Sequence, residues 1–302
     1  MIDLVPDIKR YPHIFIAHQK SKLIIFIGAG VSSLWGCKSW REMAIELIED
    51  CFKYNKINYW QKKVLIEKYN NSPRRLITIA KAKLGENRYL QCLKEKIKFS
   101  EQRKKNYPNL FKNLFALNAI IITTNIDNLF TALFDSSNIH FRLDEFNSAF
   151  LKPRNLFHLH GIIDEPSSLV MTIDEYVKRY QNPQIKSFLQ EVFINNDYLL
   201  LFIGYSMGEM EIIDYMIEKY SKEMQYKIYN YYILLPFFQN EENLLECEID
   251  YFHQINVNVI PYGIDEKGYE QLYDVIAKWK EELLSETRDK FYEFTQLIEK
   301  YK

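Results

Sequence analysis

Polar side chains that could do acid–base chemistry follow two apolar runs of the chain. Asn125 and Asp127 come directly after the run at 119–124, and His160 ends the run at 155–160. Imidazole is the natural general base near neutral pH. If both runs are strands of one parallel sheet, the three side chains lie at its carboxyl edge, where open α/β sheets bind ligands. Asn125 or Asp127 could instead cap a helix formed by the next residues, NLFTALF.

A glycine turn follows another apolar run, LIIFI at 23–27. It contains Gly28, Ala29 and Gly30, and Ser32 follows two residues later. Glycines let backbone N–H groups approach a phosphate closely, and a following helix adds the positive end of its dipole. The turn lacks the third glycine of the dehydrogenase fingerprint and the Lys-Ser/Thr ending of a P-loop. Hydride transfer and ATP hydrolysis are therefore disfavoured, although the turn could serve only to join a strand to a helix.

A second glycine turn follows the apolar run YLLLFI at 198–203. Backbone amides near Gly204 and the hydroxyl of Ser206 could hold a second phosphate or a ribose. The same segment, G-Y-S-M-G, fits the nucleophile elbow of α/β-hydrolases. In that case Ser206 would need an Asp and a His later in the chain, and His253 is the only histidine downstream.

Metal binding has little support in the sequence. His158 and His160 share one face of a regular strand, but no neighbouring cysteine or H-x-x-E-H pattern supplies further ligands. We expect His158 to pack within the sheet. The four cysteines form no C-x-x-C pair, so we predict buried thiols and no metal site.

The elements that must position these residues form an alternating pattern. Six short apolar runs predict buried strands, and longer segments with helical spacing lie between them. The predicted strands are 23–27, 119–124, 155–160, 198–203, 231–235 and 257–260. This alternation predicts an α/β, Rossmann-like fold with a mostly parallel sheet of about six strands.

The sequence contains no linker or repeat, so residues 1–302 are expected to form a single domain. Residues 40–110 contain no convincing strand and predict a helical insert. Residues 265–302 predict C-terminal helices, whose aromatic residues could pack on the core or on a partner; these residues are Trp279, Phe291, Tyr292 and Phe294.

Bulk properties narrow the classes of partner. The formal net charge is −1, which gives no general reason to bind nucleic acid or an anionic membrane. No apolar run approaches the length of a membrane span, and the N-terminus lacks the basic region of a signal peptide. We expect a soluble, cytoplasmic protein that binds neither membrane nor nucleic acid directly.

The segments GAGVS, TTNID, HLHG and GYS occur in this order, each at the end of a predicted strand. Together they resemble the sirtuin superfamily, and especially its zinc-free bacterial branch of NAD-hydrolysing proteins associated with anti-phage defence. The resemblance covers residues 28 to 206. It implies that NAD is the substrate and that a sirtuin-like fold holds it.

The resemblance also implies a role for each motif. The turn of Gly28, Ala29 and Gly30 would cradle the NAD pyrophosphate, with Ser32 nearby, and Gly204 and Ser206 would support the adenosine side. In the nicotinamide half of the site, Asn125 would orient the ribose and the attacking water, Asp127 would anchor the carboxamide, and His160 would act as the base.

Two departures from the family pattern are informative. Residues 161–203 contain no cysteine, whereas protein-deacetylating sirtuins carry a four-cysteine zinc module in this region. Deacetylation is therefore disfavoured and zinc is not expected. The Ile-Pro-Asp-Phe-Arg stretch of those enzymes is replaced here by LWGCKSWREM, in which Trp40 and Arg41 have no assigned role.

We expect an NAD glycohydrolase that releases nicotinamide and ADP-ribose. The alternatives are a sensor that binds NAD or ADP-ribose without turnover, and a serine hydrolase that uses Ser206. An enzyme that destroys NAD must be held inactive in its own cell, so we also expect a homo-oligomer or a companion defence protein such as an ATPase.

Overall fold

A computed structural model describes residues 2–97, 110–194, 198–205, 212–216 and 230–285. Its centre is a seven-stranded sheet in the order β3-β4-β2-β1-β5-β6-β7, and each neighbouring pair is parallel. The strands are β1 (Leu23–Ile27), β2 (Ile120–Thr123), β3 (Ile139–His140), β4 (Leu156–His158), β5 (Leu199–Ile203), β6 (Tyr231–Phe237) and β7 (Val257–Gly263). The predicted Rossmann-like fold class is confirmed. The strand that the sequence did not predict, β3, is only two residues long and has no apolar run to reveal it.

The register of the central strands brings their carboxyl ends together. Ile27 of β1 pairs with Thr123 of β2 on one side and with Ile203 of β5 on the other. Thr123 in turn pairs with His158, the last residue of β4. The chain leaves β1 in the middle of the sheet and returns on both sides, which is the arrangement at which α/β sheets bind ligands.

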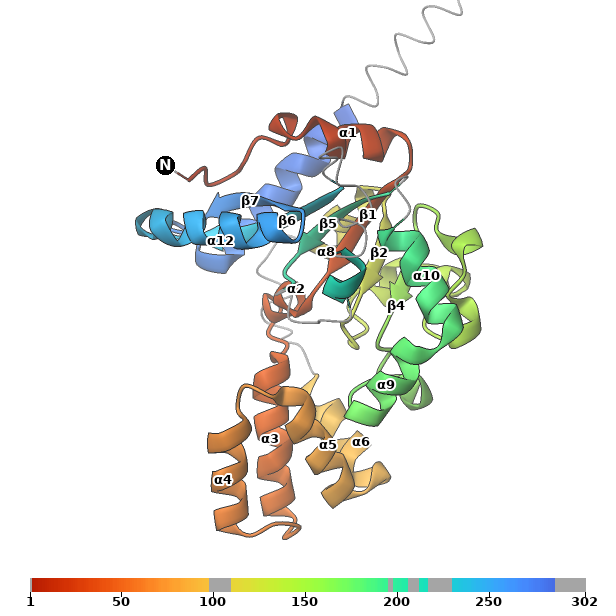
Figure 1. Ribbon diagram of the computed structural model, residues 1–302, viewed down its shortest axis with the longest axis vertical. Coiled ribbons are helices and arrows are strands. Elements are labelled where there is room, and N and C mark those ends of the chain that lie inside the picture. The colour runs from red at the N-terminus through yellow and green to blue at the C-terminus, as the bar shows by residue number, and fades with distance from the viewer. Residues whose placement is uncertain (1, 98–109, 195–197, 206–211, 217–229, 286–302) are drawn as a thin grey trace, which may run out of the picture.

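Helices cover the sheet and extend beyond it (Figure 1). They are α1 (Pro12–Gln19), α2 (Ala29–Ser33), α3 (Trp40–Lys53), α4 (Tyr59–Tyr69), α5 (Pro73–Leu84), α6 (Glu86–Lys96), α8 (Leu110–Ala116), α9 (Ile173–Gln181), α10 (Pro183–Phe193) and α12 (Glu242–Gln254). Residues 272–285 are also helical. Among the described helices, none combines the length and the apolar content needed to cross a bilayer.

Helices α3 to α6 lie between β1 and β2 in sequence and form an arm that points away from the sheet (Figure 1). Helix α3 starts at Ser39, whose side chain and that of Glu42 form a capping box. Apolar residues three or four apart, such as Ala44, Leu47 and Ile48, then face a separate hydrophobic cluster inside the arm.

The cluster inside the arm is continuous with the edge of the sheet. Ile126, which follows β2, and Met171, which precedes α9, both belong to it. A salt bridge of 2.7 Å between Lys81 of α5 and Glu175 of α9 lies at the same junction. The arm is therefore fastened to the sheet at the place where Asn125 and Asp127 emerge.

The helix at 272–285 packs on the core beneath the N-terminal segment. Trp279 is fully buried, and its indole Nε1 donates a hydrogen bond of 2.8 Å to the carbonyl of Pro6. The sequence left two locations open for Trp279, the core and a partner-binding surface, and in the structure this residue is buried in the core. Phe291, Tyr292 and Phe294 lie outside the described residues.

Buried thiols were correctly predicted for Cys51 and Cys92. The prediction is wrong for Cys247, which is exposed on α12. The only buried residue of that helix is Phe252.

Replacing Trp279 by Phe should lower the free energy of unfolding by about 2–4 kcal/mol, because it leaves a cavity and deprives the Pro6 carbonyl of its donor. The matched control is Trp60→Phe, since Trp60 is 68% exposed; it should change stability by no more than about 0.5 kcal/mol. Urea titrations of the two variants and the wild type test this. Equal stabilities for both variants would contradict the packing of the C-terminal helix.

Candidate functional site

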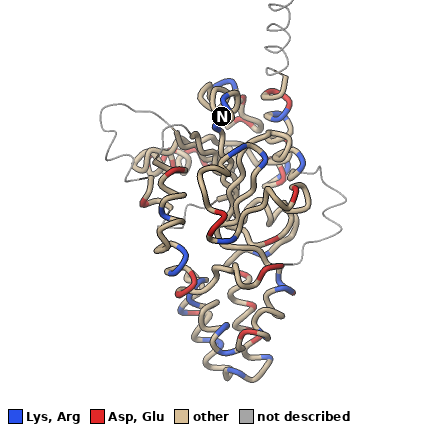
Figure 2. The backbone as a smooth tube through the Cα atoms, turned by 90° about the vertical axis from the view of Figure 1, so that its right-hand side faces the viewer, with Lys and Arg blue, Asp and Glu red and all other residues tan. Residues whose placement is uncertain are grey.

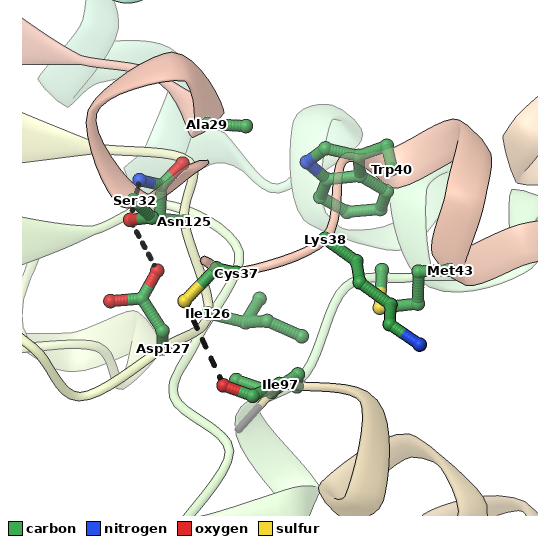
Figure 3. A pocket seen from close by; sticks show the side chains of 10 residues that line it. All are labelled: Ala29, Ser32, Cys37, Lys38, Trp40, Met43, Ile97, Asn125, Ile126 and Asp127. Carbon is green, nitrogen blue, oxygen red and sulfur yellow. Dashed lines mark hydrogen bonds between the residues drawn. The ribbon is translucent and has the colours of Figure 1, made fainter. Parts of the chain in front are cut away.

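Three polar side chains form a buried hydrogen-bonded chain at the carboxyl edge of the sheet (Figure 3). The Asn125 amide Nδ2 donates to Ser32 Oγ at 2.9 Å, and Ser32 Oγ donates to Asp127 Oδ2 at 2.7 Å. The glycine turn after β1 supplies Ser32, and the loop after β2 supplies the other two. The structure thus brings together three of the residues that the sequence predicted for one site.

The orientation of the Asn125 amide follows from its second bond. Its Nδ2 also donates to the carbonyl oxygen of Gly28 at 3.0 Å, and a carbonyl can only accept. The amide oxygen Oδ1 therefore points the other way, and it has no hydrogen-bond partner among the described residues although Asn125 is only 7% exposed. A buried acceptor without a partner is costly, so it marks a position where a ligand donor or water fits.

Asp127 has a mixed role. Its Oδ1 accepts a bond of 3.1 Å from the backbone N–H of Leu129, as a capping residue does. The helix over NLFTALF that the capping alternative required does not form, because this stretch holds only a short 3-10 helix at Thr131–Leu133. Burial raises the pKa of the Asp127 carboxyl, and the bonds from Ser32 and Leu129 oppose that rise.

The glycines of the turn are required by close packing against Gly204. A Cβ on Gly28 would lie 2.4 Å from the Gly204 carbonyl oxygen, and one on Gly30 would lie 2.9 Å from the Gly204 Cα. Gly204 itself has φ +61°, a conformation that favours glycine. The N–H groups of Gly28 and Gly30 bond to Ile203 and Gly204 carbonyls. Phosphate cradling by this turn stays a prediction that rests on the remaining amides.

A pocket opens next to this hydrogen-bonded chain (Figure 3). Besides Ala29, Ser32, Asn125 and Asp127, its wall contains three residues that follow the glycine turn; these are Cys37, Lys38 and Trp40. The cavity has a volume of about 40 Å³, which is room for a few water molecules. The enclosed part of this pocket can therefore hold only a small part of a dinucleotide. Burial raises the pKa of the Cys37 thiol to about 12, so this thiol is not a nucleophile at neutral pH.

His160 lies behind the pocket wall in an aromatic enclosure. Its side chain is fully buried, and its Nε2 lies 3.0 Å from the Tyr180 hydroxyl. The ring centroids of Trp40 and Tyr176 are 5.9 Å and 5.2 Å from that of the imidazole. Trp40 contacts both the imidazole and the pocket, so it separates His160 from a ligand bound there.

Burial keeps both histidines of this region neutral. It lowers the pKa of His160 to about 3, and the positive charges of Arg179 and Arg74 lower it further. The pKa of His158 falls to about 4, again mainly through burial. At neutral pH each imidazole therefore has one ring nitrogen without a proton, which is the form that a general base needs.

The structure gives His158 a role that the sequence did not reveal. It is buried in the sheet, as predicted, but its Nδ1 also lies 2.9 Å from the backbone carbonyl of Asn125. Since a carbonyl only accepts, this nitrogen carries the proton and donates. His158 therefore holds the backbone of Asn125 in place. The register between β2 and β4 places His158 opposite Thr123, two residues before Asn125, and knowledge of that register would have indicated this hydrogen bond.

Two arginines near His160 were also missed. Arg74 of α5 lies with its guanidinium 3.3 Å from the ring centroid of Tyr176, and Arg179 of α9 donates to the Ser168 carbonyl at 2.9 Å. The first is a cation–π contact between the arm and the enclosure around the imidazole. Neither residue belongs to a sequence motif, so only the fold brings them here.

Some predicted features lie outside the described residues or find no counterpart in them. Ser206 lies outside the described residues, and so does most of the G-Y-S-M-G segment. His253 is exposed on α12. Within the described part of the chain, no group of three or more His, Cys, Asp or Glu side chains could hold a metal ion.

The segment that contains most of the site residues matches a known domain family. Residues 119–260 match the SIR2-like domain. The match supports the sirtuin-like superfamily and an NAD-related function, and the SIR2-like segment contains Asn125, Asp127, His160 and Gly204. The glycine turn at 28–30 precedes this segment, and the pairing of β1 with β2 and β5 joins the two. A comparison with curated proteins gave no significant match.

The depressed histidine pKa values predict a dependence of stability on acidity. Protons bind His160 in the unfolded chain near its ordinary pKa of 6.5 but bind the folded protein only near 3. The folded state should therefore lose about 2 kcal/mol through His160 between pH 7 and pH 5. His160→Gln removes this proton difference, so urea titrations at several pH values should give a shallower slope for the variant. Equal slopes would show that the imidazole is hydrated in the folded protein.

Proposed function

We propose that this protein is an NAD glycohydrolase. Water would replace nicotinamide at the anomeric carbon of the ribose, giving nicotinamide, ADP-ribose and a proton. The observation that carries the proposal is the unpartnered Asn125 Oδ1, held by Ser32 beside the Asp127 carboxylate in the pocket at the centre of the sheet edge.

Each side chain has a task in this reaction. Breaking the bond to nicotinamide leaves a ribose with oxocarbenium character, so the site must align the substrate and stabilise positive charge. Asn125 Oδ1 can accept a hydrogen bond from a ribose hydroxyl or from the attacking water. The oxygens of Asp127 have further acceptor capacity, which suits the amide N–H group of the nicotinamide carboxamide.

His160 supplies the base in this proposal. It is neutral at pH 7 and lies just beyond Trp40. Outward movement of Trp40 would connect the imidazole with the pocket and admit water, which would bring the histidine pKa back toward its ordinary value. The nearby charges of Arg74 and Arg179 favour the neutral form throughout.

The narrow pocket is consistent with an enzyme that is inactive until it is switched on. We propose that opening of the wall around Trp40 and Lys38 is the activating change. A regulated NADase suits a role in defence against phage, exercised through a homo-oligomer and a companion protein such as an ATPase. Synthesis of the protein alone would then leave the NAD of the host intact, and NAD would be consumed only after activation.

A second candidate is a sensor that binds NAD or ADP-ribose without turnover. The burial of His160 behind Trp40 favours it, because an imidazole that never meets the ligand cannot act as a base. In this case NAD would bind saturably and no nicotinamide would be released.

His160→Gln and Asn125→Ala should each reduce nicotinamide release by about 10²–10⁴-fold, which is the usual contribution of a general base or a transition-state contact. Chromatographic quantification of nicotinamide, ADP-ribose and its cyclic form measures the effect. Thermal unfolding of each variant shows whether it is folded.

The matched controls are His253→Gln and Asn128→Ala, because both side chains are exposed. They should retain wild-type turnover. If folded His160→Gln and Asn125→Ala release nicotinamide as fast as the controls do, the assignment of the base and of the orienting amide is wrong. If the wild type binds NAD without any release, the sensor is the better description.

A further inference from the structure

The far end of the arm carries an exposed aromatic and basic surface. Helix α3 runs away from the sheet, so its last residues and the start of α4 lie at this end (Figure 1). We define the basic tip as the exposed side chains at its surface, namely Phe52, Lys53, Lys56, Tyr59, Trp60, Lys63 and Val64. Residues 51–70 contain five lysines and a single acidic residue, whereas the whole chain has a net charge of −1.

The apolar members of the basic tip are exposed to an unusual degree. Trp60 is 68% exposed, Tyr59 55% and Val64 50%, and no residue of α4 is buried. Residues 59, 60, 63 and 64 lie on one face of the helix, because positions four apart are neighbours there. Exposed aromatic side chains clustered with cations mark an interaction surface, since a soluble surface rarely leaves such a group bare.

A second exposed surface has the opposite charge. Helix α12 packs beside β7 with only Phe252 buried, and it lies away from the arm (Figure 1). Residues 239–254 contain five acidic residues and neither Lys nor Arg. Glu242, Glu246 and Asp250 are spaced by four, so they form an acidic row along one face.

Exposed apolar side chains lie along the other flank of the same helix, because positions 244 and 251 are turned by roughly 150° from the acidic row. Leu244 is 48% exposed, Tyr251 53%, and Phe238, just before the helix, 43%. We define the acidic face as the outward surface of α12 that the acidic row, Glu242, Glu246 and Asp250, borders on one flank and these three apolar residues border on the other. Like the basic tip, it offers both charged and apolar side chains, and its charge is opposite in sign. Figure 2 shows the distribution of both charges along the chain.

We propose that the basic tip of one molecule docks on the acidic face of a second copy of this chain. One contact then accounts for both surfaces: lysines meet carboxylates, and the aromatic side chains of the tip cover the exposed apolar groups of α12. The proposal goes beyond the NAD chemistry and does not depend on it. A nucleic acid could also attract the basic tip, but it would leave the acidic face unexplained.

The geometry makes the contact heterologous. Because the tip and α12 lie on different parts of the molecule, each copy that docks leaves its own acidic face and its partner's tip available. Such head-to-tail contacts continue until they close a ring or extend a filament. The arm that bears the tip also carries Trp40 and Arg74, so each docked neighbour holds the element that covers His160.

Charge-reversal variants of the full chain test the proposal by analytical ultracentrifugation at low and high salt. The tip variant is Lys56→Glu/Lys63→Glu and the acidic-face variant is Glu246→Lys/Asp250→Lys. Lys178→Glu/Lys186→Glu is the control for the tip variant, because it makes the same charge change at exposed positions of α9 and α10. All four substitutions in the two test variants are at exposed positions, so each protein should fold.

The wild type and the control should associate with rising concentration, and salt should weaken the association. Each test variant should show an apparent dissociation constant raised by about tenfold or more. Mixing the two variants should restore association, since one retains an intact tip and the other an intact acidic face.

Three outcomes would overturn the proposal. The wild type could stay monomeric at all concentrations, or the acidic-face variant alone could associate like the wild type, which would exclude α12 from the contact. Finally, a labelled single-stranded oligonucleotide could bind the monomeric wild type and the acidic-face variant but not the tip variant. That result would assign the basic tip to nucleic acid instead.

Discussion

Contact between two backbone turns determines where the candidate site lies. The turn after β1 and the turn after β5 meet so closely that Gly28, Gly30 and Gly204 have no space for a Cβ. This contact fixes the start of α2 and therefore the position of Ser32. Ser32 in turn bonds to Asn125 and Asp127, which emerge from the neighbouring strand. The sequence suggested that these glycines bind phosphate. In the structure they allow the turns after β1 and β5 to pack closely, which places Ser32 within hydrogen-bond distance of the loop after β2.

The site and the arm depend on each other. Trp40 is the first residue of α3 and also lines the pocket, and Arg74 of α5 lies against Tyr176 in the enclosure of His160. A narrow pocket and a buried imidazole are therefore properties of the arm's position as much as of the sheet. A SIR2-like segment that contains Asn125 and His160 is covered, in this chain, by an element that lies before it in sequence.

Strand placement and motif clustering could be predicted from the sequence, because buried parallel strands are continuous apolar runs and their carboxyl ends share one edge. Ser32, Asn125 and Asp127 were found in this way. The environment of His160 could not be predicted, since its partners come from two distant segments without a motif: Trp40 from α3, and Tyr176 and Tyr180 from α9. Placement of His160 on the same regular strand as His158 was also too simple: β4 ends at His158, and the chain turns before His160. The hydrogen bond between His158 and the Asn125 carbonyl could have been predicted only from the register between β2 and β4, which the sequence does not give.

Ile126 connects the hydrophobic cluster of the arm with the site residues on either side of it. It lies between Asn125 and Asp127, yet its side chain belongs to the hydrophobic cluster of the arm. If the Ile126 backbone follows a displacement of the cluster, the planar peptide groups on either side of it must turn. Those peptide groups join Ile126 to Asn125 and Asp127, so a displacement of the arm of that kind would reorient the amide and the carboxylate at the pocket.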